Sequence, residues 1–177
     1  MSDPITVGVT ENSDDLTAIY RLRYEVYCYE LRALDPTNYP DKQEVDVYDE
    51  YSIHIIARRG QEIAGAMRLI RDNERGFAME KQFLLPPTLD RSKTVEHSRV
   101  VIPKKYRGVG ILDLLLEAAY SWQRERGITT CIGAAVTHTL GPKLLKLGYR
   151  PLGPAIAAYD NVMLLPVVYR LENSPTQ

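Results

Sequence analysis

Residues 94–120 have the sequence TVEHSRVVIPKKYRGVGILDLLLEAAY and carry the clearest structural signals in the chain. The β-favouring run 94–102 predicts a strand, and residues 111–120 are strong helix formers. Between them, Gly108 and Gly110 allow the backbone to pass close to a ligand, while the helix start presents free N–H groups. A strand, a glycine turn and a helix in this order favour a bound phosphate, with a plain tight turn as the alternative.

The segments on either side predict further strands and helices. The predicted strands are residues 5–9, 51–58, 62–70, 94–102, 128–136 and 161–171, with a further one at 149–152, and the predicted helices are residues 14–31, 77–83, 111–127 and 139–147. The run 12–15, Asn-Ser-Asp-Asp, supplies a capping oxygen and first-turn acids for the first helix, and the prolines within 35–43 predict an irregular crossing segment. Strands that alternate with helices in this order indicate an α/β (α+β) fold, with one mixed sheet covered by helices.

Length and composition favour one cytoplasmic domain over residues 1–177. The 22 Lys and Arg residues nearly balance 23 Asp and Glu residues, so no global field attracts nucleic acid. No apolar run approaches the roughly 20 residues of a membrane span. Cys28 and Cys131 are expected to be separate apolar thiols, and the three scattered histidines predict no metal site.

Basic residues gather near the glycine turn and on a later helix. They are Lys104, Lys105, Arg107, Lys143, Lys146 and Arg150. A cationic rim beside a phosphate-sized turn suits coenzyme A or the phosphopantetheine arm of an acidic acyl carrier protein. The alternative is a solvated surface face without a partner.

The pattern Lys105-x-x-Gly108-x-Gly110 resembles the acyl-donor loop of the GNAT acyltransferase superfamily. Four further blocks are RYEVY at 23–27, EVDVYD at 44–49, GAMRL at 65–69 and EHSR at 96–99. In order and spacing they are similar to the signature of the acyl-homoserine-lactone synthases and N-acyl amino acid synthases. This resemblance implies a mixed, mostly antiparallel sheet flanked by helices on both faces.

The resemblance also implies roles for individual residues. Around the acceptor it places Arg23, Tyr27, Glu44, Asp46, Asp49, Arg68, Glu96 and Arg99, and around the donor thioester it places Val100, Val101, Lys105, Arg107, Gly108, Val109 and Gly110. No tightly bound cofactor is implied, because acyl-phosphopantetheine acts as co-substrate on acyl carrier protein or CoA. The chain departs from the pattern in three places: Tyr27 stands where the family usually has Phe, the usual Trp after the first block is absent, and Leu144 stands where many acetyl-CoA enzymes have Tyr.

The chemistry of the same residues supports an amine acceptor. An amine attacks a thioester only in its neutral form, so a base is needed, and Glu96 is the candidate. The guanidinium groups of Arg99, Arg68 or Arg23 suit a substrate carboxylate. The acidic residues of the second block would then position these guanidinium groups. A buried salt-bridge network with no catalytic role is the alternative.

Glu96 and Arg99 are three residues apart, so on a regular strand their side chains point to opposite faces. Both can serve one site only if the strand is irregular between them. We therefore predict a β-bulge within residues 98–101, which would also direct an unpaired N–H at the thioester oxygen.

These observations predict an N-acyltransferase that moves a medium or long acyl group from acyl carrier protein or acyl-CoA to a small amine such as an amino acid. One alternative is acyl-homoserine-lactone synthesis from S-adenosylmethionine. Others are a non-catalytic acyl-thioester sensor and a housekeeping acetyltransferase. The length of the acyl chain, the identity of the acceptor and the oligomeric state stay open.

Overall fold

The structure is a computed structural model that describes residues 3–159 and 162–171. The chain divides into two compact units, Met1–Leu69 with Arg99–Ser121, and Ile70–Ser98 with Trp122–Gln177. The division falls within strand β4 (Thr94–Val101). A single domain over residues 1–177 stays a prediction, and Asn161, where the last predicted strand begins, lies outside the described residues.

The first unit is built on two complete strands, most of a third and the end of β4. They are β1 (Ile5–Thr10), β2 (Ser52–Arg59) and β3 (Glu62–Arg71), which continues into the second unit, in the order β1-β2-β3-β4. β1 runs antiparallel to β2, with a register from Ile5 opposite Arg59 to Thr10 opposite His54. Gly60 has a φ of 59° in the turn between β2 and β3, which glycine adopts without strain.

Helix α1 (Ser13–Tyr24) begins within the predicted capping run 12–15, and the Asn12 side chain accepts hydrogen bonds from two backbone N–H groups of the first turn. At Glu25–Glu30 the helix widens into a π-helical segment, so the predicted helix 14–31 is confirmed in extent but not in its winding. Leu31 N donates to Val26 O at 2.9 Å, five residues back. Such segments are frequent at functional sites.

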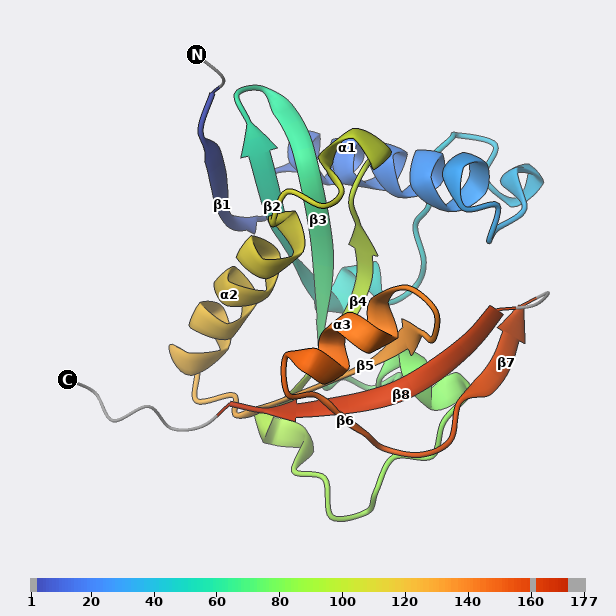
Figure 1. Ribbon diagram of the computed structural model, residues 1–177, viewed down its shortest axis with the longest axis vertical. Helices are drawn as coiled ribbons and strands as arrows, with labels where there is room; N and C mark the ends of the chain where they lie inside the picture. Colours follow the sequence, from blue (N-terminus) through green and yellow to red (C-terminus); the bar gives the residue numbers. More distant parts are fainter. Residues whose placement is uncertain (1–2, 160–161, 172–177) are drawn as a thin grey trace. The chain divides into compact units, whose positions relative to one another are not determined.

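Helix α2 (Ile111–Arg124) and α1 flank opposite faces of β3 (Figure 1). A Cβ added at Gly65 would lie 2.7 Å from Ile111 of α2. Ala66, the next residue, points to the other face and packs with Ile19 and Val26. The predicted layers, with helices on both faces of the sheet, are therefore confirmed in this unit.

The second unit holds the start of β4 and the C-terminal strands. They are β5 (Thr130–Val136), β6 (Arg150–Pro151), β7 (Ile156–Tyr159) and β8 (Val162–Arg170). β4 pairs with β5 in parallel, whereas β8 runs antiparallel to β5, β6 and β7. The mixed, mostly antiparallel sheet is confirmed; β7 was not predicted.

Short helical elements complete the fold. They are α3 (Leu140–Lys146) and the 3₁₀ turns Pro36–Asn38, Asp49–Tyr51, Ala78–Lys81, Arg91–Lys93 and Lys104–Tyr106. The predicted helix 77–83 is only the turn Ala78–Lys81, where Phe77 N donates to Glu80 Oε2 at 2.6 Å. Cys28 and Cys131 are free and buried, as predicted.

Candidate active site

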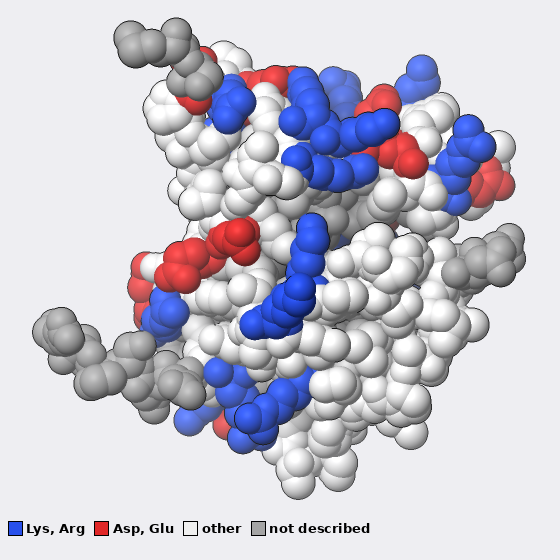
Figure 2. Space-filling view, in the orientation of Figure 1, with Lys and Arg blue, Asp and Glu red and all other residues white. Residues whose placement is uncertain are grey.

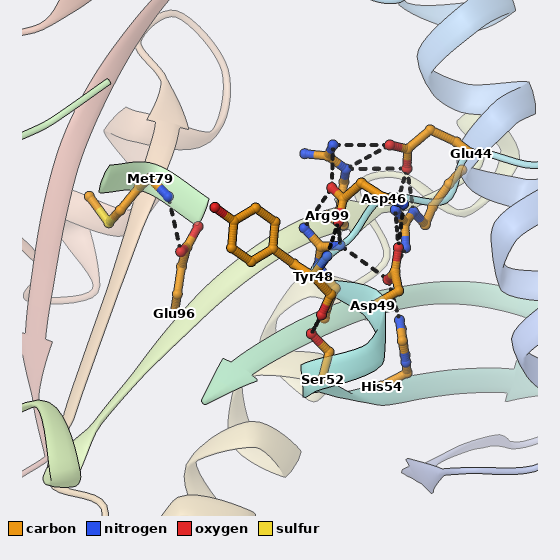
Figure 3. A network of polar contacts seen from close by, with 11 residues as sticks. Glu44, Asp46, Tyr48, Asp49, Ser52, His54, Met79, Glu96 and Arg99 are labelled. Atoms are coloured by element: carbon orange, nitrogen blue, oxygen red, sulfur yellow. Dashed lines mark hydrogen bonds and ion pairs between the residues drawn. The ribbon is translucent and has the colours of Figure 1, made fainter. Parts of the chain in front are cut away.

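Six charged side chains of the first unit form a closed ring of ion pairs (Figure 3). Around this ring, Arg23 pairs with Glu44, Glu44 with Arg99, Arg99 with Asp46, Asp46 with Arg68, Arg68 with Asp49, and Asp49 with Arg23. Positive and negative groups alternate, so each guanidinium lies between two carboxylates. The family resemblance placed these six and Glu96 in one polar cluster, and the ion pairs of the ring join the six but do not include Glu96.

Most ion pairs of the ring are bidentate, with one guanidinium donating two hydrogen bonds to one carboxylate. Arg23 donates to Asp49 Oδ1 at 2.7 Å and to Oδ2 at 3.2 Å, and Arg68 makes the same pair of distances to Asp46. Arg99 donates through Nε to Glu44 Oε1 at 3.1 Å and through Nη2 to Asp46 Oδ2 at 3.0 Å. Such paired bonds fix the orientation of both groups.

Local hydrogen bonds hold the acidic segment in place. Glu44 N donates to Tyr20 O of α1 at 3.0 Å. Asp46 N donates to Asp49 Oδ2 at 2.9 Å, and Tyr48 N donates to Asp46 Oδ1 at 2.8 Å. Side chains that bond to nearby backbone in this way stabilise a turn without a regular helix. The irregular segment therefore presents its carboxylates in fixed positions.

The ring also sets the charge of its members. Burial alone would raise the pKa of Asp49, but hydrogen bonds from His54 and Arg23 outweigh it and hold this pKa well below its ordinary value. Burial would also raise the pKa of Asp46, but the hydrogen bond and charge of Arg68 together with the charge of Arg99 outweigh it and lower this pKa. Both carboxyl groups are therefore ionised at neutral pH.

Two members of the ring reach the surface. The side chains of Arg23 and Arg68 are 0% exposed, and Glu44 and Asp49 are almost fully buried. Arg99 is 28% exposed and Asp46 is 26% exposed, with Nη2 and Oδ2 3.0 Å apart. A ligand can thus reach one guanidinium and one carboxylate side by side.

The backbone at Arg99 departs from regular strand geometry. Its φ is 49°, in the left-handed region that non-glycine residues rarely adopt. This irregularity falls inside residues 98–101, where a bulge was predicted. The Tyr27 hydroxyl donates to Val100 O at 3.2 Å, and the Arg99 guanidinium lies 5.8 Å from the Tyr27 ring centroid. Burial raises the pKa of Tyr27, which stays protonated as a donor.

Glu96 is a buried carboxylate of the second unit, on β4. Its Oε2 accepts a hydrogen bond from Met79 N at 3.1 Å (Figure 3). The β4–β5 ladder runs from Thr94 opposite Thr130 to Glu96 opposite Ile132. Glu96 therefore stands where parallel pairing with β5 ends, three residues before Arg99 along the chain.

His97, the next residue, is buried in a separate contact. Its Nε2 lies 2.8 Å from Gln123 Oε1 of α2. Burial lowers the pKa of His97 to about 4, so the imidazole is neutral at pH 7. His97 is therefore a neutral residue of the buried interior.

The glycine turn has the backbone that a close ligand approach needs. Gly108 and Gly110 have φ values of 79° and 84°, and a Cβ at either position would meet no atom within 4 Å. Val109 between them is exposed, and α2 begins directly afterwards. Val101, in contrast, is fully buried in the core.

The predicted cations of this turn are paired with acidic residues. Lys105 forms an ion pair with Glu62, and Arg107 forms one with Glu30. Arg107 Nε also donates to Ile102 O at 2.9 Å. Neither acidic partner was identified from the sequence, because each lies more than 40 residues from its cation and no local spacing links them.

His54 was also missed by sequence reasoning. It is buried on β2, and its Nε2 lies 3.3 Å from Asp49 Oδ1. The only sequence signal was a polar residue within an apolar strand. Over residues 3–159 and 162–171, no group of three or more His, Cys, Asp or Glu could hold a metal ion, and no helix is long and apolar enough to cross a membrane.

A family model and several solved structures match this chain. Residues 22–117 match the family described as the acetyltransferase (GNAT) domain. No curated protein matches the sequence.

Solved structures share the fold at low sequence identity. The CoA-dependent acyl-homoserine lactone synthase BjaI, solved with SAM and isopentyl-CoA, has a TM-score of 0.80 and 22% identity, covering 96% of this chain and 85% of that one. The CoA-dependent acyl-homoserine lactone synthase MesI has a TM-score of 0.76 and 21% identity, with coverages of 95% and 90%. FeeM, an N-acyl amino acid synthase from uncultured soil microbes, has a TM-score of 0.69 and 12% identity, with coverages of 97% and 91%.

Proposed function

The chain belongs to the acetyltransferase (GNAT) domain family and is an acyltransferase, and from this premise we propose a donor and an acceptor. The donor is a medium or long acyl thioester of phosphopantetheine, carried by acyl carrier protein or by CoA. The acceptor is the amine of a small molecule with a carboxylate, such as an amino acid. The product is an N-acyl amino acid. The free, buried thiols fit the reducing cytoplasm, where we place the reaction.

The exposed pair of Arg99 and Asp46 carries the proposal for the acceptor. A guanidinium and a carboxylate 3.0 Å apart match the carboxylate and the ammonium of an amino acid. Arg23, Arg68 and the remaining carboxylates are buried, so their role is to hold this pair in its orientation. Tyr27, beside Arg99, adds an aromatic wall to the acceptor site.

Glu96 is the proposed base. It removes a proton from the ammonium, directly or through one water, and the neutral nitrogen then attacks the thioester carbon. As the C–N bond forms, the former carbonyl oxygen becomes an oxyanion. A backbone N–H of β4, beside the irregular residue Arg99, stabilises this oxyanion. Collapse of this intermediate breaks the C–S bond, and the thiolate leaves and takes up the proton that the attacking nitrogen gives up as the neutral amide forms. The left-handed φ at Arg99 supports this arrangement, since it interrupts the strict alternation of the strand.

The glycine turn is the proposed phosphate site of the donor. Gly108, Val109 and Gly110 leave open space in front of the N-terminus of α2, and the backbone of Val100 and Val101 precedes them on β4. Lys105 and Arg107 lie in the same turn. For a protein-bound donor, the proposed contacts are Lys104 in the first unit and, separately, Lys143, Lys146 and Arg150 in the second unit. Structurally similar lactone synthases are CoA-dependent, so acyl-CoA is tested beside acyl carrier protein thioesters.

Acyl-homoserine-lactone synthesis is the second candidate. Its favouring observation is the fold shared with a lactone synthase solved with SAM. The methionine part of SAM carries the same carboxylate and ammonium as an amino acid, so the pair of Arg99 and Asp46 suits both acceptors. Release of methylthioadenosine from SAM identifies this reaction.

Product analysis tests the proposed function. The purified chain is incubated with acyl-CoA and acyl carrier protein thioesters of different lengths, together with amino acids or SAM, and products are identified by mass spectrometry. We expect N-acyl amino acids and thiol release. No product and no thiol release across the whole panel would overturn the proposal.

Substitution of the proposed base separates catalysis from binding. Glu96→Gln should lower kcat by about 100-fold or more while acceptor binding changes little, because the amide cannot take the proton. Glu50→Gln, an equal change at an exposed residue, is the matched control and should keep full activity. A sensor without catalytic function would bind thioester equally well in both variants and release no thiol in any form of the protein.

A further inference from the structure

The basic turn, defined here as Lys104, Lys105 and Arg107, is held by two carboxylates of the same unit. Lys105 pairs with Glu62, which also accepts a hydrogen bond from the Tyr106 hydroxyl at 2.5 Å. Arg107 pairs with Glu30. Two different elements, the start of β3 and the end of the π-helical segment, thus each place one acid against the turn.

These acids reduce the charge that the turn offers to a ligand. Figure 2 shows Lys and Arg atoms over the segment that leads into α2, with Asp and Glu atoms beside them. Three cations against Glu30 and Glu62 leave a net charge of +1 (3 − 2). A phosphate at Gly108 or Gly110 is attracted by the cations and repelled by both carboxylates.

The pairs are also exposed to solvent. The side chains of Lys105 and Glu62 are more than half exposed, and those of Arg107 and Glu30 are partly exposed. Exposed ion pairs contribute little to folding and are screened by salt. The stability of the fold therefore does not explain the two acids at this turn. Their direct effect is to repel an anion bound there.

We propose that Glu30 and Glu62 determine donor specificity by lowering the affinity of the basic turn for donors with several phosphate charges. This inference rests on the proposed function, because it takes the glycine turn as the donor site. Coenzyme A carries a pyrophosphate and a further phosphate, whereas a protein-bound phosphopantetheine arm carries one phosphodiester. The acids favour the donor with the lower phosphate charge at this turn.

Calorimetric titration with three probes tests the proposal. Coenzyme A, 4′-phosphopantetheine and pantetheine share the same arm but differ in phosphate charge. They are titrated into the unsubstituted protein, into Glu30→Gln, Glu62→Gln and the double variant, and into the control Glu25→Gln. Glu25 is an exposed acid of the same π-helical segment, so its substitution gives the same charge change away from the turn.

We expect a graded result. At low salt the double variant should bind coenzyme A about 5- to 10-fold more tightly and phosphopantetheine about 2- to 3-fold more tightly, with pantetheine unchanged. Because the Debye length is only a few ångströms near 1 M salt, the gain should fall below about 2-fold there. Glu25→Gln should bind all three probes like the unsubstituted protein.

Three outcomes would overturn the inference. Coenzyme A binding that is unchanged or weaker in a folded double variant rejects the role of the acids and leaves the proposed function intact. An equal gain in Glu25→Gln shows that only total charge matters. If no probe binds any form of the protein, the glycine turn is not the donor site, and the proposed donor fails together with this inference. Circular dichroism of each variant confirms that it is folded.

Discussion

The ion-pair ring and the basic turn contain the same kinds of side chain but in opposite environments. Both lie in the first unit, and both pair cations with carboxylates distant in sequence. The ring is largely buried, and most of its ion pairs are bidentate. The ion pairs of the turn are exposed, and each is made by a single contact. A charge pattern in the sequence therefore does not tell whether an ion pair stabilises the fold or can be changed at little cost. The burial of the pair determines which of the two applies.

Burial changes what the loss of one partner costs. In the ring, removal of one guanidinium leaves a carboxylate in a site that water does not reach, and the full desolvation penalty appears. At the turn, water and salt replace the lost partner at little cost. The exposed edge of the ring, Arg99 with Asp46, lies between these limits. It combines a fixed geometry with access to a ligand.

The largest expected effect is the loss of a buried member of the ring. Arg23→Met removes the partner that Glu44 and Asp49 share, and should lower the free energy of unfolding by about 3–5 kcal/mol, measured by urea denaturation. Arg21→Met, an exposed change on the same helix, should lower it by no more than about 0.5 kcal/mol. Equal losses in the two variants would contradict the distinction between buried and exposed charges.

A buried polar contact of the second unit provides a pH-dependent test. Burial lowers the pKa of His97 to about 4 from its ordinary 6.5. As the pH falls below about 6.5 the unfolded chain binds a proton that the folded chain does not, so stability is fully present above pH 6.5 and declines toward pH 4. The decline should be on the order of 3 kcal/mol, measured by denaturation at each pH.

Substitution of His97 isolates this contribution. His97→Gln removes the titrating group, so the decline between pH 6.5 and 4 should largely disappear. The ring carboxylates Asp46 and Asp49 have lowered pKa values, and their contribution is lost only below about pH 4. If His97→Gln keeps the full decline in stability between pH 6.5 and 4, another group titrates in that range.

An intermediate effect is expected at the exposed edge of the ring. Arg99→Lys keeps the charge but loses the fork that binds Glu44 and Asp46 together. The KM for the acceptor should rise by about 10-fold, and the free energy of unfolding should fall by about 1 kcal/mol, less than in Arg23→Met. A stability loss as large as that of Arg23→Met, without a change in KM, would assign Arg99 a purely structural role.

The fold was predictable where local signals were strong. The capping Asn12, the glycine turn before α2 and the apolar runs of β3 and β5 each specify an element through short-range chemistry. The π-helical widening at Glu25–Glu30 and the short strand β7 were not predictable. Both depend on packing and pairing partners far away in the chain, which local spacing does not record.

The candidate site shows the same division. The ring members were recognised as one cluster because they lie in four separate motif blocks, and an irregular backbone near Arg99 followed from strand alternation. Their closure into a ring, with only Arg99 and Asp46 exposed, was not predictable. Nor were the acids Glu30 and Glu62, because exposed pairs between distant segments leave no periodic signal.

The smallest expected effect is the loss of an exposed pair at the basic turn. Glu62→Gln removes the charge opposite Lys105, yet its amide oxygen can still accept the hydrogen bond of the Tyr106 hydroxyl. The melting temperature should therefore change by less than about 2 °C, as in the exposed control Glu50→Gln, when both are followed by circular dichroism. A drop as large as that of Arg23→Met would mean that Glu62 is part of the folding core rather than a modulator of charge. Because the same variant is expected to bind coenzyme A more tightly, an unchanged melting temperature together with a changed affinity would separate charge that holds the fold from charge that selects the ligand.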